Sequence, residues 1–430
     1  MERNYSKNRR GRRISEINSC LLFLGVLVFS LFPEFTNAKI IIVSKTGIVK
    51  TISKGVSLAN NKDTIIVYSG IYQEYSIQIK KSIVLIGKGN PVIDGNKKGS
   101  IIEVFADSVV ISGFKIINVG HSYTHDYAGI IIHNTKKCII ENNDLENVFF
   151  GIKLEKAKNC IIRNNKISGK YINEAAAGNG IHIWYGSNDT IIDNVIFGVR
   201  DGIYFEFVDN SFIKNNYSHN NLRYGLHFMF SNNDRYENNI FENNGSGVAV
   251  MFSKFIYMYK NEFRFNWGTT SYGLLLKEIY DGEIHFNVFK QNTIAINVEG
   301  CTRVNYSHND FLNNGWAIKV VGACYKNIFT KNNFLNNSFD LSYNSNTNDN
   351  RFDFNYWSDY TGYDLNKNNI GDIPYRPVKL FSYIVNKTPE TIILLRSLFI
   401  DIINFSEKVS PIFTPDNLID EHPLMKKIKW

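Results

Sequence analysis

The sequence has little proline, little cysteine and few charges. Its 430 residues include 8 Pro and 5 Cys, and 20% of them are charged. So few cysteines exclude a small scaffold held together by disulfides, and 44% hydrophobic residues exclude general disorder. The formal charge of +8 falls to +5 beyond residue 38, because the first 38 residues hold six Lys or Arg and three Asp or Glu. This diffuse charge indicates no nucleic acid partner.

Long apolar runs are also missing, except near the start of the chain. A basic stretch from Arg9 to Arg13 precedes an apolar run from Leu21 to Phe32 and a small residue at Ala38. This order is typical of an export signal, and we predict that residues 1–38 form a signal peptide cleaved near Ala38. A retained membrane anchor is the alternative, although the apolar run is shorter than the roughly 20 residues that a span needs.

Asparagine, by contrast, is abundant, with 56 residues or about 13% of the chain. It is disfavoured in helices and strands but common in turns. One asparagine marker recurs about every 22 residues, at Asn143, Asn165, Asn194, Asn216, Asn239, Asn261, Asn287, Asn309 and Asn333. A small residue followed by an apolar one keeps the same spacing, at Gly129, Gly151, Gly180, Gly202, Gly225, Gly247, Gly273, Ala295 and Ala317. Two markers in step over nine units predict a structural repeat.

Each repeat contains short runs with alternating apolar residues, such as GIHIWY and GIYFEF, between Asn and Gly turns. Period-two alternation is typical of strands. Several short strands in about 22 residues, with no helical pattern between them, fit one coil of a parallel β-helix. We therefore predict an all-β fold, a right-handed parallel β-helix over residues 39–357. Stacked coils would let the asparagine amides hydrogen-bond from coil to coil.

Residues 358–430 have a different composition and are predicted to form a C-terminal cap with a short helical tail. The segment begins rich in aromatic residues, Asp and Gly. It then contains one helical stretch that opens at Thr388-Pro389 and continues through apolar residues to Ile402. This tail either covers the open end of the coils or docks on a partner.

Alternation along the strands predicts which side chains face outward. The first and third residues after each small marker are apolar and point inward, so the second and fourth point outward. Four neighbouring coils would then expose His, Trp, Tyr and Met side chains on one surface. His227, Met229 and Met251 would lie within one or two strand positions of each other, with His182 on the same face. Imidazole and thioether are suitable ligands for Cu(I). A protein-contact patch, or a patch covered by a loop, is the alternative.

The remaining candidate sites are of three kinds. The outward residues predicted for partner contact are Trp184, Tyr204, Glu206, Lys277 and Glu278. A possible calcium loop has oxygen-bearing side chains at Asp364, Asn366, Asn368 and Asp372. Four cysteines lie beyond the signal, at Cys138, Cys160, Cys301 and Cys324, and their spacing favours buried, stacked thiols over disulfides or metal ligands.

Several blocks of the chain resemble the NosD family of nitrous oxide reductase maturation proteins. They are RDGIYFEFV, LRYGLHFMFS, GVAVMFS, SYGLLLKEIYDGEI and NYWSDYTGYDL, followed by IGDIPYRPV. The resemblance implies a periplasmic β-helix protein that is not an enzyme and that receives or presents copper, or sulfur, for a copper–sulfide centre. It also implies three partners: an inner-membrane ABC-type ATPase and permease, a copper chaperone lipoprotein, and the apo-reductase. NKNNIGD departs from the Asp-Gly-rich sequence usual in the family.

A carbohydrate-binding or carbohydrate-active β-helix protein, such as a lyase, hydrolase or epimerase, is the alternative function. Such catalysis needs carboxylates or a carboxylate and a base placed across a sugar. The outward face offers Glu206 beside Tyr204 and His227, but no paired aspartates.

Overall fold

The coordinates are a computed structural model that describes residues 38–170, 174, 177–344, 348–395, 397–409 and 418–430. The predicted signal peptide therefore lies outside the described residues, apart from Ala38. The chain divides into two compact units, Met1–Lys39 and Ile40–Trp430, and every element named below belongs to the second unit. Within the described ranges, no helix has the length and apolar character needed to cross a bilayer.

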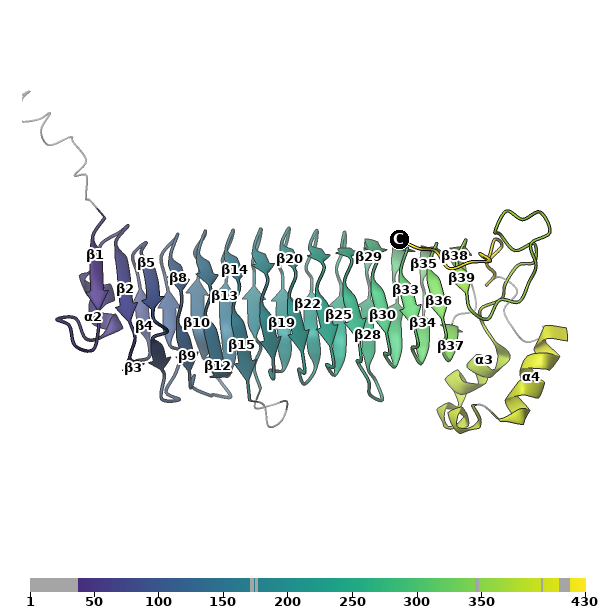
Figure 1. Ribbon diagram of the computed structural model, residues 1–430, viewed down its shortest axis with the longest axis horizontal. Helices are drawn as coiled ribbons and strands as arrows, with labels where there is room; N and C mark the ends of the chain where they lie inside the picture. The colour runs from purple at the N-terminus through teal and green to yellow at the C-terminus, as the bar shows by residue number, and fades with distance from the viewer. Residues whose placement is uncertain (1–37, 171–173, 175–176, 345–347, 396, 410–417) are drawn as a thin grey trace, which may run out of the picture. The chain divides into compact units, whose positions relative to one another are not determined.

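The described strands form three parallel sheets, which we call A, B and C. From β2 onward the chain adds one strand to A, then one to B, then one to C (Figure 1), so neighbours in a sheet are three strands apart in the chain. β1 adds one further strand to A, beside β2. This arrangement is the predicted parallel β-helix, and its strands run from Ile40 to Trp357.

Sheet A contains, in order, β1 (Ile40–Val43), β2 (Thr64–Tyr68), β5 (Val84–Lys88), β8 (Val110–Ser112), β11 (Ile139–Glu141), β14 (Ile161–Arg163), β17 (Thr190–Ile192), β20 (Phe212–Lys214), β23 (Arg235–Glu237), β26 (Tyr257–Tyr259), β29 (Tyr280–His285), β32 (Thr302–Ser307), β35 (Tyr325–Thr330) and β38 (Asp349–Asp353). Sheet B contains β3 (Ile71–Gln73), β6 (Val92–Asp94), β9 (Lys115–Ile117), β12 (Asp144–Val148), β15 (Lys166–Gly169), β18 (Val195–Phe197), β21 (Tyr217–His219), β24 (Ile240–Glu242), β27 (Glu262–Arg264), β30 (Val288–Lys290), β33 (Asp310–Leu312), β36 (Asn333–Leu335) and β39 (Tyr356–Trp357). Sheet C contains β4 (Ile77–Ile79), β7 (Ile102–Val104), β10 (Ala128–His133), β13 (Phe150–Glu155), β16 (Ile181–Trp184), β19 (Asp201–Glu206), β22 (Tyr224–Met229), β25 (Ser246–Met251), β28 (Tyr272–Lys277), β31 (Ile294–Glu299), β34 (Trp316–Val321) and β37 (Phe339–Asn344).

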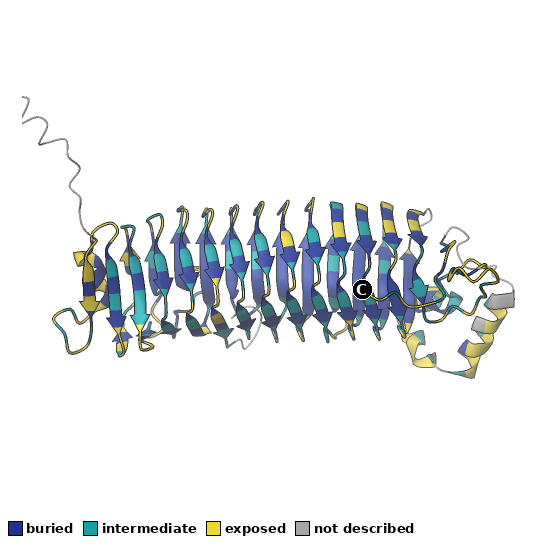
Figure 2. Ribbon diagram, turned by 45° about the horizontal axis from the view of Figure 1, so that its top comes forward, coloured by how far each residue is buried: buried dark blue, intermediate teal, exposed yellow. Residues whose placement is uncertain are grey.

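Apolar side chains from all three sheets fill the space inside the coils, which Figure 2 shows as buried bands along the strands. The residues predicted to point inward from sheet C, including Ile181, Ile183, Leu226 and Phe228, are all fully buried. Towards the last coils the sheet B interior becomes aromatic. Its rings stack with centroid distances of 4.6, 5.1, 4.7 and 4.0 Å from Phe263 through Phe289, Phe311 and Phe334 to Trp357.

The predicted asparagine ladder is present at the corner between sheets A and B. Each amide oxygen accepts hydrogen bonds from the backbone N–H and the side-chain Nδ2 of the preceding ladder asparagine, at 2.9–3.1 Å from Asn143 to Asn309. The ninth position was wrong by one residue, because Asn309 bonds to Asn332 and not to Asn333. Asn333 begins β36 and bonds to Ile428 instead.

A second ladder runs along the corner between sheets B and C. Its members are Asn221, Asn244, Asn266, Asn292, Asn314 and Asn337. At both corners the residue before the ladder position is often in left-handed backbone, which asparagine tolerates better than most residues. Two corners of the coil therefore account for much of the high asparagine content.

Helices occupy both ends of the described coils. The short helix α2 (Ile52–Leu58) was not predicted; its first N–H groups bond to the Glu74 carboxylate, which is distant in sequence. The C-terminal segment forms α3 (Leu380–Lys387), the 3-10 helix η2 (Pro389–Leu394) and α4 (Leu398–Val409). The single helix predicted from Thr388 was wrong in its limits, because Thr388 follows α3 and precedes η2.

The C-terminal helices pack on the outer face of sheet C. Phe381 and Val385 of α3 and Ile400 of α4 form one buried cluster with Ile294, Trp316 and Phe339 at the edge of three strands. Asn386 also bonds to Ser342 of β37. The helices therefore cover this face at the last coils and leave it uncovered on the coils around β19 to β25.

Candidate functional site

The candidate residues lie on the outer face of sheet C, where β16, β19, β22 and β25 pair in register. His182 pairs with Tyr204, which pairs with His227. Glu206 pairs with Met229, which pairs with Met251. Neighbouring strands lie about 4.8 Å apart, and residues two apart on a strand about 6.6 Å. The sheet thus brings His227, Met229 and Met251 together.

His227 is buried, although it points outward from the sheet. Only 6% of the residue is exposed, and the rings of Tyr224 and Tyr204 lie 4.8 and 5.1 Å from its imidazole. The prediction that His227 lies on an exposed surface was therefore wrong, because large neighbouring side chains on the same face cover it. Met229 and Met251 remain half-buried and form the accessible part of the set.

His182 lies apart from this set. It is on β16, two strands from His227 with Tyr204 between them, so the two backbones are roughly 10 Å apart. Metal binding by His182 stays a prediction. Among the described residues there is also no group of three or more His, Cys, Asp or Glu side chains that could hold a metal.

A polar network that the sequence did not reveal lies beside these histidines. Asp201 is fully buried, and its Oδ2 lies 3.8 Å from His227 Nδ1 and 3.5 Å from Arg200 Nε. Arg200 Nη2 donates to Asn179 Oδ1 at 3.2 Å, and Asn179 Nδ2 lies 3.0 Å from His182 Nδ1. Asp201 directly precedes the small-residue marker Gly202. Asp201 is the one carboxylate at that position among the nine marked coils, and this was the available signal.

Burial and charge shift the pKa of several groups on this face. Burial, with nearby Lys153, lowers the pKa of His182 to about 4. Burial, with neighbouring Glu206, raises the pKa of Tyr204 to about 12. The hydrogen bond with His133, with Lys153 nearby, lowers the pKa of Glu155 to about 2. At neutral pH the face therefore holds a neutral His182, a protonated Tyr204 and an ionised Glu155.

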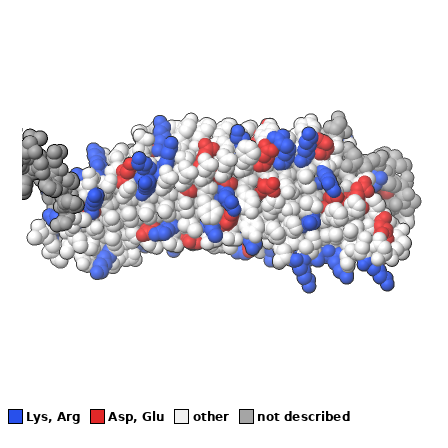
Figure 3. All heavy atoms as spheres, turned by 90° about the horizontal axis from the view of Figure 1, so that it is seen from above, with Lys and Arg blue, Asp and Glu red and all other residues white. Residues whose placement is uncertain are grey.

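The residues predicted for partner contact are spread along the same face. Trp184 is half-buried, Tyr204 donates its hydroxyl to Glu206 at 3.3 Å, and Lys277 pairs with Glu299 at 3.1 Å. Glu278 is exposed at the corner that follows β28. On the face shown in Figure 3, basic and acidic side chains are interspersed along the coils.

An exposed row of stacked aromatic rings follows this face at the next corner, and we call it the aromatic row. It consists of Tyr185, Phe207, Phe230 and Phe252, with successive centroid distances of 4.6, 5.2 and 5.2 Å. All four residues are in left-handed backbone, with φ of 50–55°. The same corner is left-handed in the coils on either side, at Lys156 and Glu278, so this conformation belongs to the coil repeat. The phenylalanines directly follow Glu206, Met229 and Met251 in the sequence.

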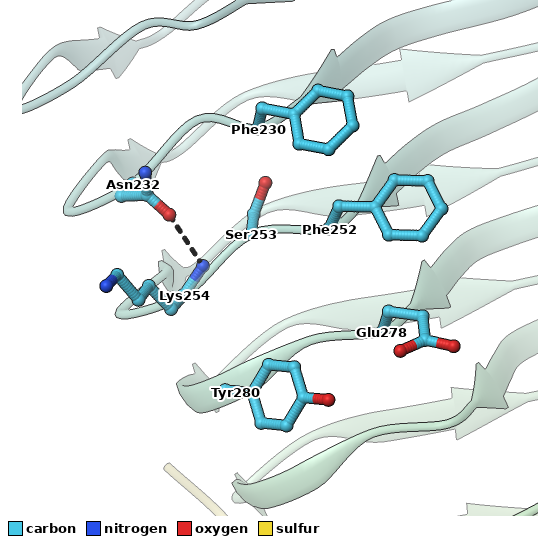
Figure 4. Close-up of a pocket in the computed structure, with 7 residues that line it drawn as sticks. All are labelled: Phe230, Asn232, Phe252, Ser253, Lys254, Glu278 and Tyr280. Carbon is cyan, nitrogen blue, oxygen red and sulfur yellow. Dashed lines mark hydrogen bonds between the residues drawn. The ribbon is translucent and has the colours of Figure 1, made fainter.

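A shallow pocket opens beside the aromatic row (Figure 4). Phe230 and Phe252 line one side, and Lys254, Glu278 and Tyr280 line the rest together with Asn232 and Ser253. Asn232 Oδ1 accepts a hydrogen bond from the backbone N–H of Lys254 at 3.1 Å. The pocket therefore places two phenylalanine rings beside one basic side chain, Lys254, and one acidic side chain, Glu278.

The four residues of the possible calcium loop lie together between β39 and α3, but their oxygens already have partners. Asp364 accepts from the backbone N–H groups of Asn368 and Asn369, at 3.1 and 2.8 Å. Asn366, Asn368 and Asp372 accept backbone N–H groups of the same loop, at 2.6–3.0 Å. A calcium ion would compete with these bonds, and its binding here stays a prediction.

The four cysteines beyond the signal are buried free thiols. Each sulfur bonds to at least one backbone carbonyl, such as Cys301 Sγ to Leu276 O at 3.5 Å. The prediction of stacked thiols inside the coils is confirmed.

Residues 167–362 match the family model described as "NosD: Periplasmic copper-binding protein (NosD)". This part of the chain is therefore similar to NosD proteins. The match includes every strand from β16 to β39, and with them His182, His227, Met229, Met251 and the aromatic row. The resemblance noted from the sequence blocks is thereby confirmed.

Two curated relatives carry the name "Probable ABC transporter binding protein NosD". The one from Stutzerimonas stutzeri is 30% identical over 122 residues, 28% of each chain. The one from Pseudomonas aeruginosa is 26% identical over 144 residues, 32% of this chain and 31% of the relative. The chain thus matches less than a third of the length of either relative.

Solved structures of similar fold include the mannuronan C-5 epimerase AlgE4 A-module of Azotobacter vinelandii, with TM-score 0.56 and 13% identity over 68% of this chain and 91% of that one. The family 28 exopolygalacturonase of Yersinia enterocolitica has TM-score 0.56 and 11% identity, over 74% of this chain and 78% of that one. At this identity the likeness shows the β-helix fold alone.

Proposed function

We propose that this chain is an exported accessory protein that handles copper during maturation of the copper–sulfide centre of nitrous oxide reductase. Copper is the cargo in this proposal. The observation that carries it is the pairing of Met229 with Met251 on adjacent strands, with Met229 two residues from His227 on β22. Thioether and imidazole groups favour Cu(I) over ions that prefer oxygen ligands.

The arrangement suggests an order of contact for the ion. Met229 and Met251 are half-exposed, whereas His227 lies behind Tyr224 and Tyr204. An arriving Cu(I) would meet the two thioethers first. It would reach His227 only after a neighbouring tyrosine side chain turns aside.

The proposed partners are those of the family resemblance: an ABC-type ATPase and permease in the inner membrane, a copper chaperone lipoprotein and the apo-reductase. Two surfaces support partner docking. The aromatic row runs beside Met229 and Met251, where a copper donor or acceptor would have to bind. The second surface is on η2 and α4, where Ile393, Leu398, Phe399 and Phe405 are 57–86% exposed. A location in the periplasm, at the inner-membrane surface, follows from these partners.

The test of copper handling is the double substitution Met229→Leu with Met251→Leu. Leucine keeps the volume and apolar character but removes both sulfur ligands. We expect Cu(I) affinity, measured by competition with a chromophoric chelator, to fall at least tenfold, and the reductase made in cells to contain less copper. Met258→Leu is the matched control, because Met258 is buried inside sheet A. Unchanged affinity and a fully loaded reductase in the double variant would contradict the proposal.

A further inference from the structure

His182 is held by a chain of hydrogen bonds that fixes where its proton lies. Arg200 Nη2 lies 3.2 Å from Asn179 Oδ1. A guanidinium group only donates, so the oxygen of the Asn179 amide faces Arg200 and its NH₂ group faces His182. Asn179 Nδ2 is a donor 3.0 Å from His182 Nδ1, so this ring nitrogen accepts. A neutral His182 then carries its proton on Nε2, and the lowered pKa of this residue agrees with a neutral ring.

His227 has the opposite environment. Its Nδ1 faces Oδ2 of Asp201 at 3.8 Å, beyond hydrogen-bonding distance. Both oxygens of Asp201 and both ring nitrogens of His227 are buried and lack a hydrogen-bond partner among the described residues. Buried polar groups are nearly always paired, and a carboxylate can only accept. If Nδ1 carries the proton, a small rotation of the ring lets it donate a hydrogen bond to Asp201 Oδ2. If Nδ1 carries a lone pair, two hydrogen-bond acceptors face each other.

We propose that the fold holds these two imidazoles in opposite tautomers, His182 protonated on Nε2 and His227 on Nδ1, with Asp201 as the positioning residue for His227. Only His227 then presents a free Nε2 lone pair to an incoming metal. A carboxylate bonded to the far nitrogen is the usual support of a metal-binding histidine. The inference rests on the copper function proposed above and adds which nitrogen binds and which residue orients it.

The tautomers are measurable without copper. Long-range ¹H–¹⁵N correlation spectra of the full chain, labelled at histidine and freed of metal with a chelator, distinguish a protonated ring nitrogen from a bare one. His182→Gln and His227→Gln assign the two sets of signals, since each variant removes one set. We expect a protonated Nε2 for His182 and a protonated Nδ1 for His227.

Two substitutions test what holds each ring. Asp201→Asn keeps the shape but adds a donor, so His227 should lose its single Nδ1–H form, and the dissociation constant for Cu(I) should rise about 10- to 100-fold. Asn179→Asp is the matched reverse change. The new carboxylate would accept from both Arg200 and His182, so His182 should move its proton to Nδ1 while the signals of His227 stay unchanged.

The outcomes separate this inference from the copper proposal. A wild-type His227 protonated on Nε2, or an Asp201→Asn variant with an unchanged spectrum of His227, would overturn the tautomer assignment even if copper binds. The expected spectra together with no Cu(I) binding by the wild-type chain would overturn the copper proposal and Asp201's role in it, and leave the two tautomers standing.

Discussion

Asn239 shows what a single ladder residue does for this fold. Its side-chain oxygen accepts from the backbone and side chain of Asn216, and its Nδ2 donates to Asn261 and to the carbonyl of Ile213. One fully buried amide therefore joins three successive coils. Strand pairing holds each coil to its neighbours. The ladder also aligns the corner between sheets A and B from one coil to the next.

Asn239→Ala should lower the free energy of unfolding by about 2–4 kcal/mol, because it leaves several buried donors and acceptors without partners. Urea denaturation followed by circular dichroism measures this change. Asn238→Gly is the control, since Asn238 is exposed in left-handed backbone that glycine also adopts, and its effect should stay within about 0.5 kcal/mol. Equal losses in the two variants would contradict the ladder's role.

The candidate site also shows, at the residue scale, what the sequence can predict. Period-two alternation was sufficient to place His227, Met229 and Met251 on one face and in register. It could not predict the burial of His227, because that depends on the size and rotamers of Tyr204 and Tyr224 on other strands. The Asp201 contact was missed for the same reason: it joins residues from neighbouring coils.

At the scale of elements, the C-terminal helices differ from the coils that they follow. One face of α3 and α4 is buried against Trp316 and Phe339 of sheet C. On α4, Leu398, Phe399, Ile402 and Phe405 remain more than half exposed. They recur at helical spacing and so lie on one side of the helix. This apolar side is the surface proposed to contact the permease.

Replacing Phe399 and Phe405 together by serine should weaken binding to the permease about 10²- to 10⁴-fold, because burying each ring contributes about 1.5–3 kcal/mol. The thermal midpoint of the isolated protein should not fall, since both rings are exposed. Phe255→Ser, a change at a corner residue that is 51% exposed, is the control. Undiminished co-purification would show that α4 does not form the contact.

Elements were predicted well where the pattern repeats and poorly where it stops. Nine units in step were enough to predict the coils, and only the adjacent pair Asn332 and Asn333 made the last position ambiguous. The helix α2 was missed although Thr51 caps it locally, by accepting from the backbone N–H of Lys54 at 3.3 Å. Two further N–H groups of its first turn bond to Glu74, which sequence patterns could not connect to this helix. The start of α3 was missed because Lys379 provides no side-chain cap.

At the scale of the whole described unit, the last residues of the chain return to the end of the coils. Asp420 is fully buried, and its Oδ2 accepts from the backbone N–H and Nδ2 of Asn355 and from Trp357 Nε1, at 2.9–3.1 Å. Ile428 then bonds to Asn333, one coil further back. The ladder that begins at Asn143 therefore ends on a carboxylate from a separate segment.

Asp420→Ala should loosen the last coil without unfolding the first ones, because coils contact mainly their neighbours. Hydrogen–deuterium exchange should rise in residues 349–357 and stay unchanged before residue 300. Asp420→Asn is the control, since its amide oxygen can still accept the same three hydrogen bonds. Exchange that is equally slow in the alanine variant would show that the carboxylate does not hold this end.

The ladder also has a direction, and this bears on how the molecule avoids polymerising. Each asparagine receives hydrogen bonds from the coil before it and donates to the coil after it, so an open last coil would be a template for the first coil of another molecule. Exposed strand edges carry this hazard in general. Asp420 accepts the last hydrogen bonds of the ladder, from Asn355, but its carboxylate has no N–H group that could donate to a further coil. One side chain from a later segment of the same chain thus ends the ladder.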